Sequence, residues 1–257
     1  MDKKITVISL SSGSDGNATY VKAGQTEILI DVGMSARYIC NSLKEIGTDI
    51  SNINAVFITH EHTDHVKGLD VLSKQTRLPV HMTNESANEY ARRHSRYGNI
   101  VSHDKNYEHV IGEITVRSFF ASHDSCACVG YTVETEDDKF GIATDMGYVD
   151  RGAIEALKNC RSVILESNYD EKKLKCGCYP EVLKHRIMSS KGHLSNYDCA
   201  AFARFLAENG TKNFMLGHLS EENNTPELAY NVTSRALNGF DDVLLKVAQR
   251  KKTTYFV

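Results

Sequence analysis

Three histidines and an aspartate fall within six residues, in the run His60-Glu61-His62-Thr63-Asp64-His65. The run begins where a short apolar segment, residues 54–59, ends, and that segment is predicted to be a buried strand. In a tight loop, side chains two residues apart can turn toward one point. His60 and His62 can therefore bind one ion, while Asp64 and His65 face a second.

The mixture of imidazole and carboxylate indicates which metals would suit such a site. Nitrogen and carboxylate ligands together suit zinc, manganese or iron, whereas sites made only of oxygen suit magnesium or calcium. The alternative is a polar surface loop rich in histidine, but such a loop does not require four ligand-type residues at this spacing. We therefore predict two divalent metal ions, zinc or manganese, with iron as a third candidate.

Further residues of ligand type follow other apolar segments. Each of them, taken alone, is an ordinary polar residue at a strand exit. Strand ends in one sheet lie side by side, so residues there can converge on one rim, and their recurrence favours a shared site. They are Asp31 after residues 27–30, His123 after 119–122, Asp145 after 140–144, and His218 after 213–217.

The chain shows no internal linker. It has three prolines and no stretch rich in glycine and serine, which predicts a single domain over residues 1–257. Strands interleaved with helices favour a sandwich of sheets covered by helices over a simple doubly wound sheet. We expect strands at residues 5–10, 18–22, 27–31, 54–59, 78–81, 114–121, 129–135, 140–144, 162–166 and 213–217. We expect helices after Ser35 and at 66–73, 84–94, 151–158, 197–208 and 226–237.

Composition bears on location and partners. No apolar stretch approaches the ~18 residues of a membrane span, and the amino terminus lacks the pattern of a signal peptide. Seven scattered cysteines fit reduced thiols, so we expect a cytoplasmic protein with no membrane partner. The net charge of −3 argues against a generally basic nucleic-acid coat but permits a local basic groove.

Two Cys-x-Cys pairs, Cys126/Cys128 and Cys176/Cys178, offer another possible zinc site if they meet in space. Their spacing is not the C-x₂₋₄-C of structural zinc sites, which favours free thiols.

Together these motifs resemble the five signature motifs of the metallo-β-lactamase fold superfamily, over nearly the whole chain. The resemblance implies an α/β fold of the αββα type, in which two mixed sheets are covered by helices on both outer faces. An aspartate at position 145 is typical of the branch with two bridged metals, whereas true lactamases carry cysteine for the second metal. The implied roles are one metal on His60, His62 and His123, the other on Asp64, His65 and His218, Asp145 bridging both, and Asp31 orienting the histidine loop.

The closing third of the chain resembles RNase Z-type enzymes. The likeness lies in Gly192-His193-Leu194-Ser195-Asn196 and in the segment 214–220 that contains His218. In that family an extra histidine, paired with an upstream glutamate, lies beside the scissile phosphate. His193 and Glu166 match those two positions. On the residues alone, His193 has a second interpretation, as a cap of the helix that starts near Ser195.

Residues 11–17 and 219–224 are similar to the WalJ (YycJ) family of Gram-positive bacteria. That resemblance implies a 5′ to 3′ exonuclease on double-stranded DNA, typically with manganese. The loop 11–17 could present backbone N–H groups to a phosphate, with Ser14 and Asn17 as candidate contacts, or be a plain turn. Lys172, Lys173 and Lys175 adjoin the proposed catalytic section, where a phosphate backbone would lie, although most charge runs are only solvated faces.

The chemistry of the motifs supports the same class. Two metals can lower the pKa of a shared water and neutralise charge on a phosphoryl group. Asp64 or Asp145 can orient that water, and His193 backed by Glu166 can give a proton to the leaving oxygen. The leading hypothesis is a phosphodiesterase acting on nucleic acid, DNA before RNA. The alternative is a small-molecule ester or thioester hydrolase of the same fold, which the acidic net charge favours.

Overall fold

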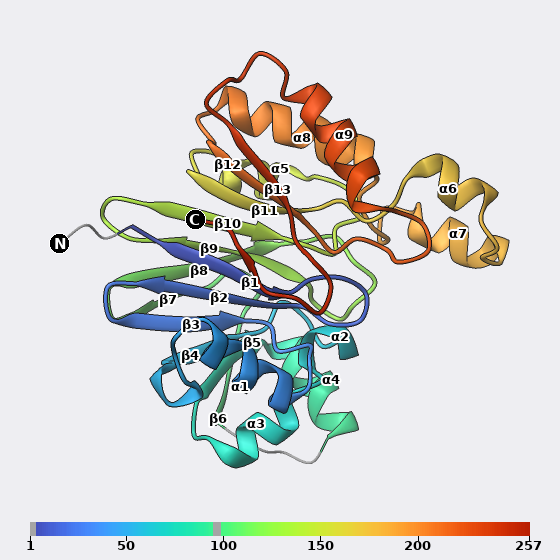
Figure 1. Cartoon of the computed structure of the whole chain (residues 1–257). Coiled ribbons are helices and arrows are strands. Elements are labelled where there is room, and N and C mark those ends of the chain that lie inside the picture. Colours follow the sequence, from blue (N-terminus) through green and yellow to red (C-terminus); the bar gives the residue numbers. More distant parts are fainter. Residues whose placement is uncertain (1–3, 95–98) are drawn as a thin grey trace.

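Two seven-stranded sheets form the centre of the computed structural model, which describes residues 4–94 and 99–257 (Figure 1). The first sheet has the order β14 (Thr254–Tyr255), β1 (Thr6–Ser11), β2 (Ala18–Ala23), β3 (Thr26–Ile30), β4 (Ala55–Phe57), β5 (Pro79–Thr83) and β6 (Asn99–His103). The second has the order β13 (Leu244–Val247), β12 (Asn213–Gly217), β11 (Ser162–Glu166), β10 (Lys139–Ala143), β9 (Val129–Glu134), β8 (Ile114–Phe120) and β7 (Glu108–Ile111). Both sheets mix parallel and antiparallel neighbours.

Helices cover the outer face of each sheet (Figure 1). The first sheet carries α1 (Ala36–Glu45), α3 (Leu69–Gln75) and α4 (Asn84–Arg93), and the second carries α5 (Arg151–Leu157), α8 (Asn196–Glu208) and α9 (Pro226–Ala236). Apolar side chains such as Val7, Phe57 and Tyr131 fill the space between the sheets. The αββα sandwich with two mixed sheets is therefore confirmed. None of the helices in the described ranges has the length and low polarity needed to cross a membrane.

The sandwich brings several strand ends to one edge. In the first sheet β3, β4, β5 and β6 run parallel, as do β10, β11, β12 and β13 in the second. The inner strands of these sets, β3, β4, β10, β11 and β12, have helices on one side and a second sheet on the other, so they are buried on both faces and have nearly unbroken apolar runs. Because parallel strands end on the same side, the loops that follow β3, β4, β10, β11 and β12 meet at one edge of the molecule.

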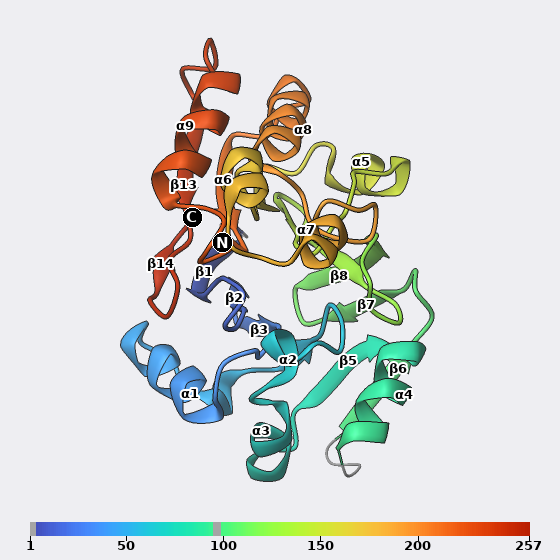
Figure 2. The same cartoon turned by 90° about the vertical axis from the view of Figure 1, so that its right-hand side faces the viewer.

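Several elements differ from the prediction. The expected helix at 66–73 is two helices, α2 (Thr63–Val66) and α3, separated at Gly68. A Cβ at Gly68 would lie 2.4 Å from the carbonyl oxygen of Met34, so the chain passes too close there for any side chain. The elements that were not predicted are short or exposed: the 3-10 turn η1 (Ile50–Asn52), β6, β7, β13, β14, α6 (Glu171–Cys176) and α7 (Glu181–Ile187). Helices α6 and α7 form an arm beside the functional edge (Figures 1 and 2).

Candidate metal centre

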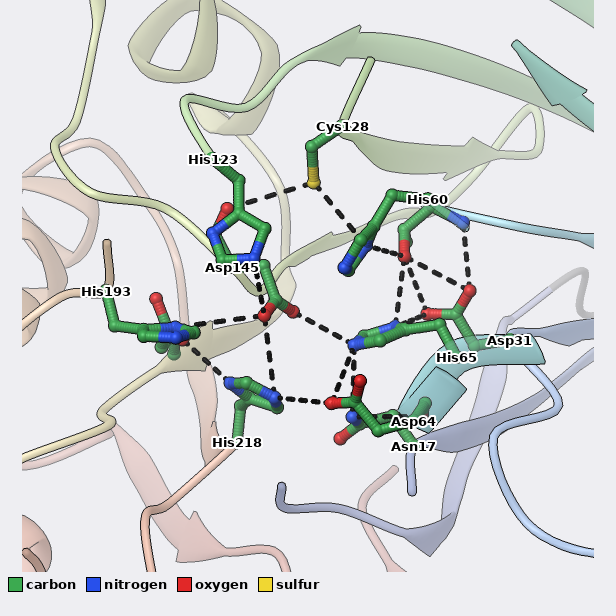
Figure 3. Close-up of polar contacts among 12 residues, drawn as sticks. Asn17, Asp31, His60, Asp64, His65, His123, Cys128, Asp145, His193 and His218 are labelled. Atoms are coloured by element: carbon green, nitrogen blue, oxygen red, sulfur yellow. Dashed lines mark hydrogen bonds and ion pairs between the residues drawn. The ribbon is translucent and has the colours of Figure 1, made fainter. Parts of the chain in front are cut away.

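The ligand-type side chains meet at the edge where these loops converge (Figure 3). Among the described residues, three groups of three side chains and one group of four have donor atoms within 4.8 Å of one another, which is close enough to hold an ion. The groups of three are His60, His62 and His123; Asp64, His65 and His218; and His60, His65 and Asp145. The structure thus brings together the residues that the sequence predicted for each metal. Their role as ligands stays a prediction.

In the first group, the contacts of Nδ1 leave the Nε2 atoms of His60 and His123 facing the cluster. His123 Nδ1 donates to the carbonyl oxygen of Gly192 at 3.0 Å, and its Nε2 faces carboxylate oxygens of Asp124 and Asp145 at 3.3 and 3.7 Å. His60 Nδ1 lies 3.1 Å from Thr59 Oγ1 and 3.6 Å from Cys128 Sγ. His60 Nε2 is buried and has no hydrogen-bond partner among the described residues. An unpaired buried acceptor of this kind is costly unless a cation binds it.

In the second group, a carboxylate behind each histidine sets the ring orientation. Asp31 Oδ2 accepts from His65 Nδ1 at 2.8 Å, and Glu166 Oε1 accepts from His218 Nδ1 at 2.8 Å. The Nε2 atoms of His65 and His218 then face Asp64 Oδ2, at 3.4 and 3.3 Å. Carboxylates that orient ligand histidines in this way are common around bound metals. Asp31 therefore makes the contact predicted for it.

Asp145 lies between the two groups (Figure 3). Its Oδ1 is 3.7 Å from His123 Nε2 and 3.5 Å from His218 Nε2, and its Oδ2 is 3.2 Å from His65 Nε2. Oδ2 has no hydrogen-bond partner within the described residues. Lone pairs of nitrogen and oxygen thus converge from three directions on one buried place. This donor set fits divalent metal ions.

Burial and neighbouring charges shift the pKa values of the cluster residues in different directions. Burial, together with the charge of His65, holds the pKa of His60 well below its usual value. Burial acts in the same direction on His218, yet Asp145, Asp64 and Glu166 raise its pKa to about 10. Burial would raise the pKa of Asp145, but the charges of His218 and His65 hold it well below the usual range. The cluster therefore holds ionised carboxylates that require positive charge nearby, and a metal ion supplies it by displacing protons.

The backbone of the site is strained. Asp31, Asp145 and His218 have φ values of 61°, 59° and 54°, in the left-handed region that few non-glycine residues adopt. Gly33 lies so close to the histidine loop that a Cβ there would be 1.6 Å from the carbonyl oxygen of Asp64. Such strain persists where the surrounding structure requires it, commonly at functional sites.

Glu166 and His193 form the predicted pair. Glu166 Oε1 accepts from His193 Nδ1 at 2.7 Å, and Oε2 accepts from the N–H groups of Met146 and Leu194 at 2.9 and 3.0 Å. Burial would raise the pKa of Glu166, but the charge and hydrogen bond of His193 and the hydrogen bond of His218 lower it to about 2. Ser195 caps α8 by accepting from the Asp198 N–H, so His193 is not the cap.

Most of the candidate substrate contacts lie outside the cluster, and one of them, Asn17, packs against the histidine loop instead. Ser14 is exposed on the loop 11–17. Asn17 is buried, its Oδ1 accepts from the Gly13 N–H at 2.9 Å, and its Nδ2 lies 3.2 Å from His65 Nε2. The amide of Asn17 therefore braces the site rather than facing solvent. The three lysines Lys172, Lys173 and Lys175 lie on α6, in the arm.

Two supporting residues were not predicted. Cys128 is buried behind His60, with its Sγ 3.8 Å from the carbonyl oxygen of Asp145. Glu61 is also buried: its Oε1 accepts from the Cys126 N–H at 2.9 Å and its Oε2 from the Ser86 hydroxyl at 2.8 Å. Glu61 thus ties the histidine loop to the loop that carries His123. In the sequence, the position of Glu61 between the predicted ligands His60 and His62 was the feature that could have indicated this supporting role.

Replacing Glu61 by alanine is expected to lower the free energy of unfolding by about 1–3 kcal/mol, because the Cys126 N–H loses its buried acceptor. Glu61→Gln is expected to cost less, since its amide oxygen can still accept from Cys126 and its NH₂ can donate to Ser86. Urea unfolding measures both, and Glu85→Ala, an exposed residue of α4, is the control. Equal losses in the alanine and glutamine variants would contradict this account.

All seven cysteines are free. None of the metal-capable groups found in the described residues contains a cysteine. The structure therefore gives no support to a zinc site on Cys126/Cys128 and Cys176/Cys178, and the interpretation as free thiols agrees with it.

The chain is similar to known proteins in both sequence and fold. The profile of the Beta-lactamase superfamily domain matches residues 26–219. Exodeoxyribonuclease WalJ of Streptococcus pneumoniae is 38% identical over 230 residues, which cover 86% of this chain and 84% of that protein. Exodeoxyribonuclease YycJ of Bacillus anthracis is 35% identical over 233 residues, covering 89% and 87%. The metallo-beta-lactamase fold protein YhfI from Bacillus subtilis has a TM-score of 0.76 at 15% identity, over 98% of this chain and 100% of that one, a likeness of fold alone.

Proposed function

The chain belongs to the beta-lactamase superfamily, close to WalJ and YycJ, and we propose that it is a metal-dependent exodeoxyribonuclease. One geometric observation carries the reaction class: a cluster of metal donors lies beside a histidine, His193, whose Nδ1 is held by a buried carboxylate. Metal ions held by this cluster would stabilise the charge on a phosphoryl group, and His193 would supply a proton to the leaving oxygen. The DNA substrate is taken from the relatives, whose identity to this chain extends over most of its length.

We assign two divalent ions, zinc or manganese, to the cluster. His60, His62 and His123 would hold one, Asp64, His65 and His218 the other, and Asp145 would contact both. Bound ions would supply Lewis-acid charge at the phosphoryl oxygens and acidify the attacking water. The free state of all seven cysteines suits a reducing compartment, and on that basis we propose a cytoplasmic location.

The residues of the chain itself position the reactants. The side chain of His193 is 18% exposed, against 2% for His123 and 3% for His218, so His193 can reach a substrate. With Nδ1 donating to Glu166, its Nε2 is free to hold the proton that the leaving oxygen receives. The side chain of Asp64 is 25% exposed, whereas that of Asp145 is 2% exposed. We therefore assign to Asp64 the orientation of the attacking water.

The proposal is tested with labelled 5′-phosphorylated duplex DNA, single-stranded DNA, RNA, a cyclic nucleotide and a thioester, each with manganese, zinc or magnesium. We expect release of mononucleotides from DNA, which is lost when a chelator removes the metal. Thioester or cyclic-nucleotide hydrolysis without degradation of any nucleic acid would move the assignment to a small-molecule hydrolase.

The affinity for duplex DNA is expected to fall steeply with salt, because each neutralised phosphate releases condensed counterions. If Lys172, Lys173 and Lys175 contact the backbone, replacing all three by alanine should make the slope of log K against log salt shallower by up to about three. Fluorescence anisotropy on a catalytically silent complex, with the metal omitted, gives these slopes. The control is the triple alanine variant of Lys44, Lys74 and Lys105, three exposed lysines on the first sheet's side. A slope that is the same in both triple variants would exclude α6 from the interface.

A further inference from the structure

A groove of about 720 Å³ lies between α6 and the first turns of α8 and α9. Figures 1 and 2 both place α6 beside those helix ends. Tyr197, which is 60% exposed, forms one wall, and its hydroxyl has no hydrogen-bond partner among residues 4–94 and 99–257. We call this feature the α6–α8 groove.

The α6–α8 groove is built directly onto the catalytic section. Asp170, the cap of α6, comes four residues after Glu166, and Tyr197 comes four residues after His193. The two segments pair with each other, because the Asn196 N–H donates to the Tyr169 carbonyl at 2.9 Å. Four residues of chain span at most about 14 Å. Since a strand of B-DNA rises about 3.4 Å per nucleotide, the groove lies within about four nucleotides of a phosphate at His193.

The lining of the groove combines positive charge with an apolar floor. Its walls carry three lysines and two carboxylates, an excess of one positive charge. Lys175 pairs with Glu171 at 3.2 Å, whereas Lys172 is exposed and has no ion-pair partner in the part of the chain that the structure describes. Leu228 and Cys176 contribute apolar surface beside the ring of Tyr197. A stacking ring next to a free cation suits a nucleotide, whose base has an aromatic face and whose phosphate is negative.

We propose that the α6–α8 groove binds the substrate strand a few nucleotides from the scissile phosphate, with a base stacked on Tyr197 and a backbone phosphate at Lys172. This assignment rests on the proposed function and adds a subsite to it. It gives α6 a specific task, namely to hold DNA while the metal centre and His193 act on the end of the strand.

Tyr197→Ala and Tyr197→Phe separate stacking from other roles, since phenylalanine keeps the ring. Tyr197→Ala removes one base stack. It is therefore expected to lower kcat/KM for DNA about tenfold relative to kcat/KM for bis(p-nitrophenyl) phosphate, a phosphodiester without a base. Tyr197→Phe should keep the wild-type ratio of these two kcat/KM values. Tyr255→Ala, which removes a 59% exposed tyrosine on β14, is the control and should also keep it.

A single abasic nucleotide, moved along the DNA, locates the stacked base. In wild type, one position within about four nucleotides of the scissile bond should show the same tenfold loss, and Tyr197→Ala should show no further loss there. Two results would overturn the subsite. One is that the rate depends on the position of the abasic nucleotide in the same way in wild type and in Tyr197→Ala. The other is that Tyr197→Phe loses as much kcat/KM for DNA as Tyr197→Ala. Wild type that degrades no DNA would instead overturn the proposed function, and the subsite with it.

Discussion

His193→Ala is expected to slow DNA hydrolysis by roughly 10²–10⁴-fold while the bound metal stays at the wild-type level. The Nδ1 of His193 donates to Glu166, which leaves Nε2 to protonate the leaving oxygen. A sugar oxygen is a poor leaving group without that proton, whereas nitrophenolate leaves readily without it. Hydrolysis of bis(p-nitrophenyl) phosphate should therefore fall far less than that of DNA. Steady-state rates on both substrates and elemental analysis of the metal provide the measurement.

His185→Ala is the matched control for this substitution, because His185 is exposed on α7 and, among the described residues, its ring bonds only to the carbonyl oxygen of Glu181. It should leave both rates unchanged. His193 also belongs to a group with Asp145, Glu166 and His218 that is compact enough to hold an ion. Loss of metal in His193→Ala would make this residue a ligand, and equal loss on both substrates would make it a positioning residue.

Much of the site could be predicted because its residues follow strands with clear apolar runs. Asp31 and His218 come one residue after β3 and β12, and Asp145 comes two residues after β10. Each of these strands is buried on both faces, so its pattern is strong, and parallel strands bring their ends to one edge. The convergence of the predicted residues thus follows from elementary sheet geometry together with the spacing of the histidine run.

The supports of the site could not be predicted in the same way. Glu61 and Cys126 lie 65 residues apart in sequence, and no periodicity indicates that a buried carboxylate meets that N–H. Asn17 was a candidate substrate contact because the loop 11–17 could present backbone N–H groups to a phosphate, but its amide is turned inward against the histidine loop. Contacts between loops depend on how both sheets pack, and a pattern of polar residues in the sequence does not indicate which loops lie close together.

The arm and the edge strands escaped prediction for another reason. The strands β6 and β7 are largely exposed, and α6 and α7 have six and seven residues with many charges. Elements of this kind show weak hydrophobic periodicity, because little of their surface is buried. The charges of α6 were noted in sequence, but only the structure shows that they line a groove with Tyr197.

Asp145→Asn is expected to remove metal from the protein and to lower DNA hydrolysis by roughly 10³-fold or more, since metal charge supplies several kcal/mol of transition-state stabilisation. Its two oxygens face His123 and His218 on one side and His65 on the other. Asparagine replaces one of these oxygens with an NH₂ group that cannot bind a metal. The fold should persist, because asparagine tolerates the left-handed backbone that position 145 requires. Metal content after dialysis, together with unfolding curves, provides the measurement.

Asp31→Asn is the comparison that distinguishes a bridging ligand from a residue behind the ligands. Asp31 Oδ1 accepts from the Thr59 N–H at 2.9 Å, a bond that asparagine can keep, while Oδ2 accepts from His65 Nδ1. Loss of that orienting carboxylate is expected to weaken metal affinity by roughly 10–100-fold without changing the number of ions bound at saturation. Asp145→Asn should instead lower that number, because one carboxylate contacts both groups of donors. Wild-type stoichiometry at saturation in Asp145→Asn would exclude the bridging role and, with it, the account of two ions that share this residue.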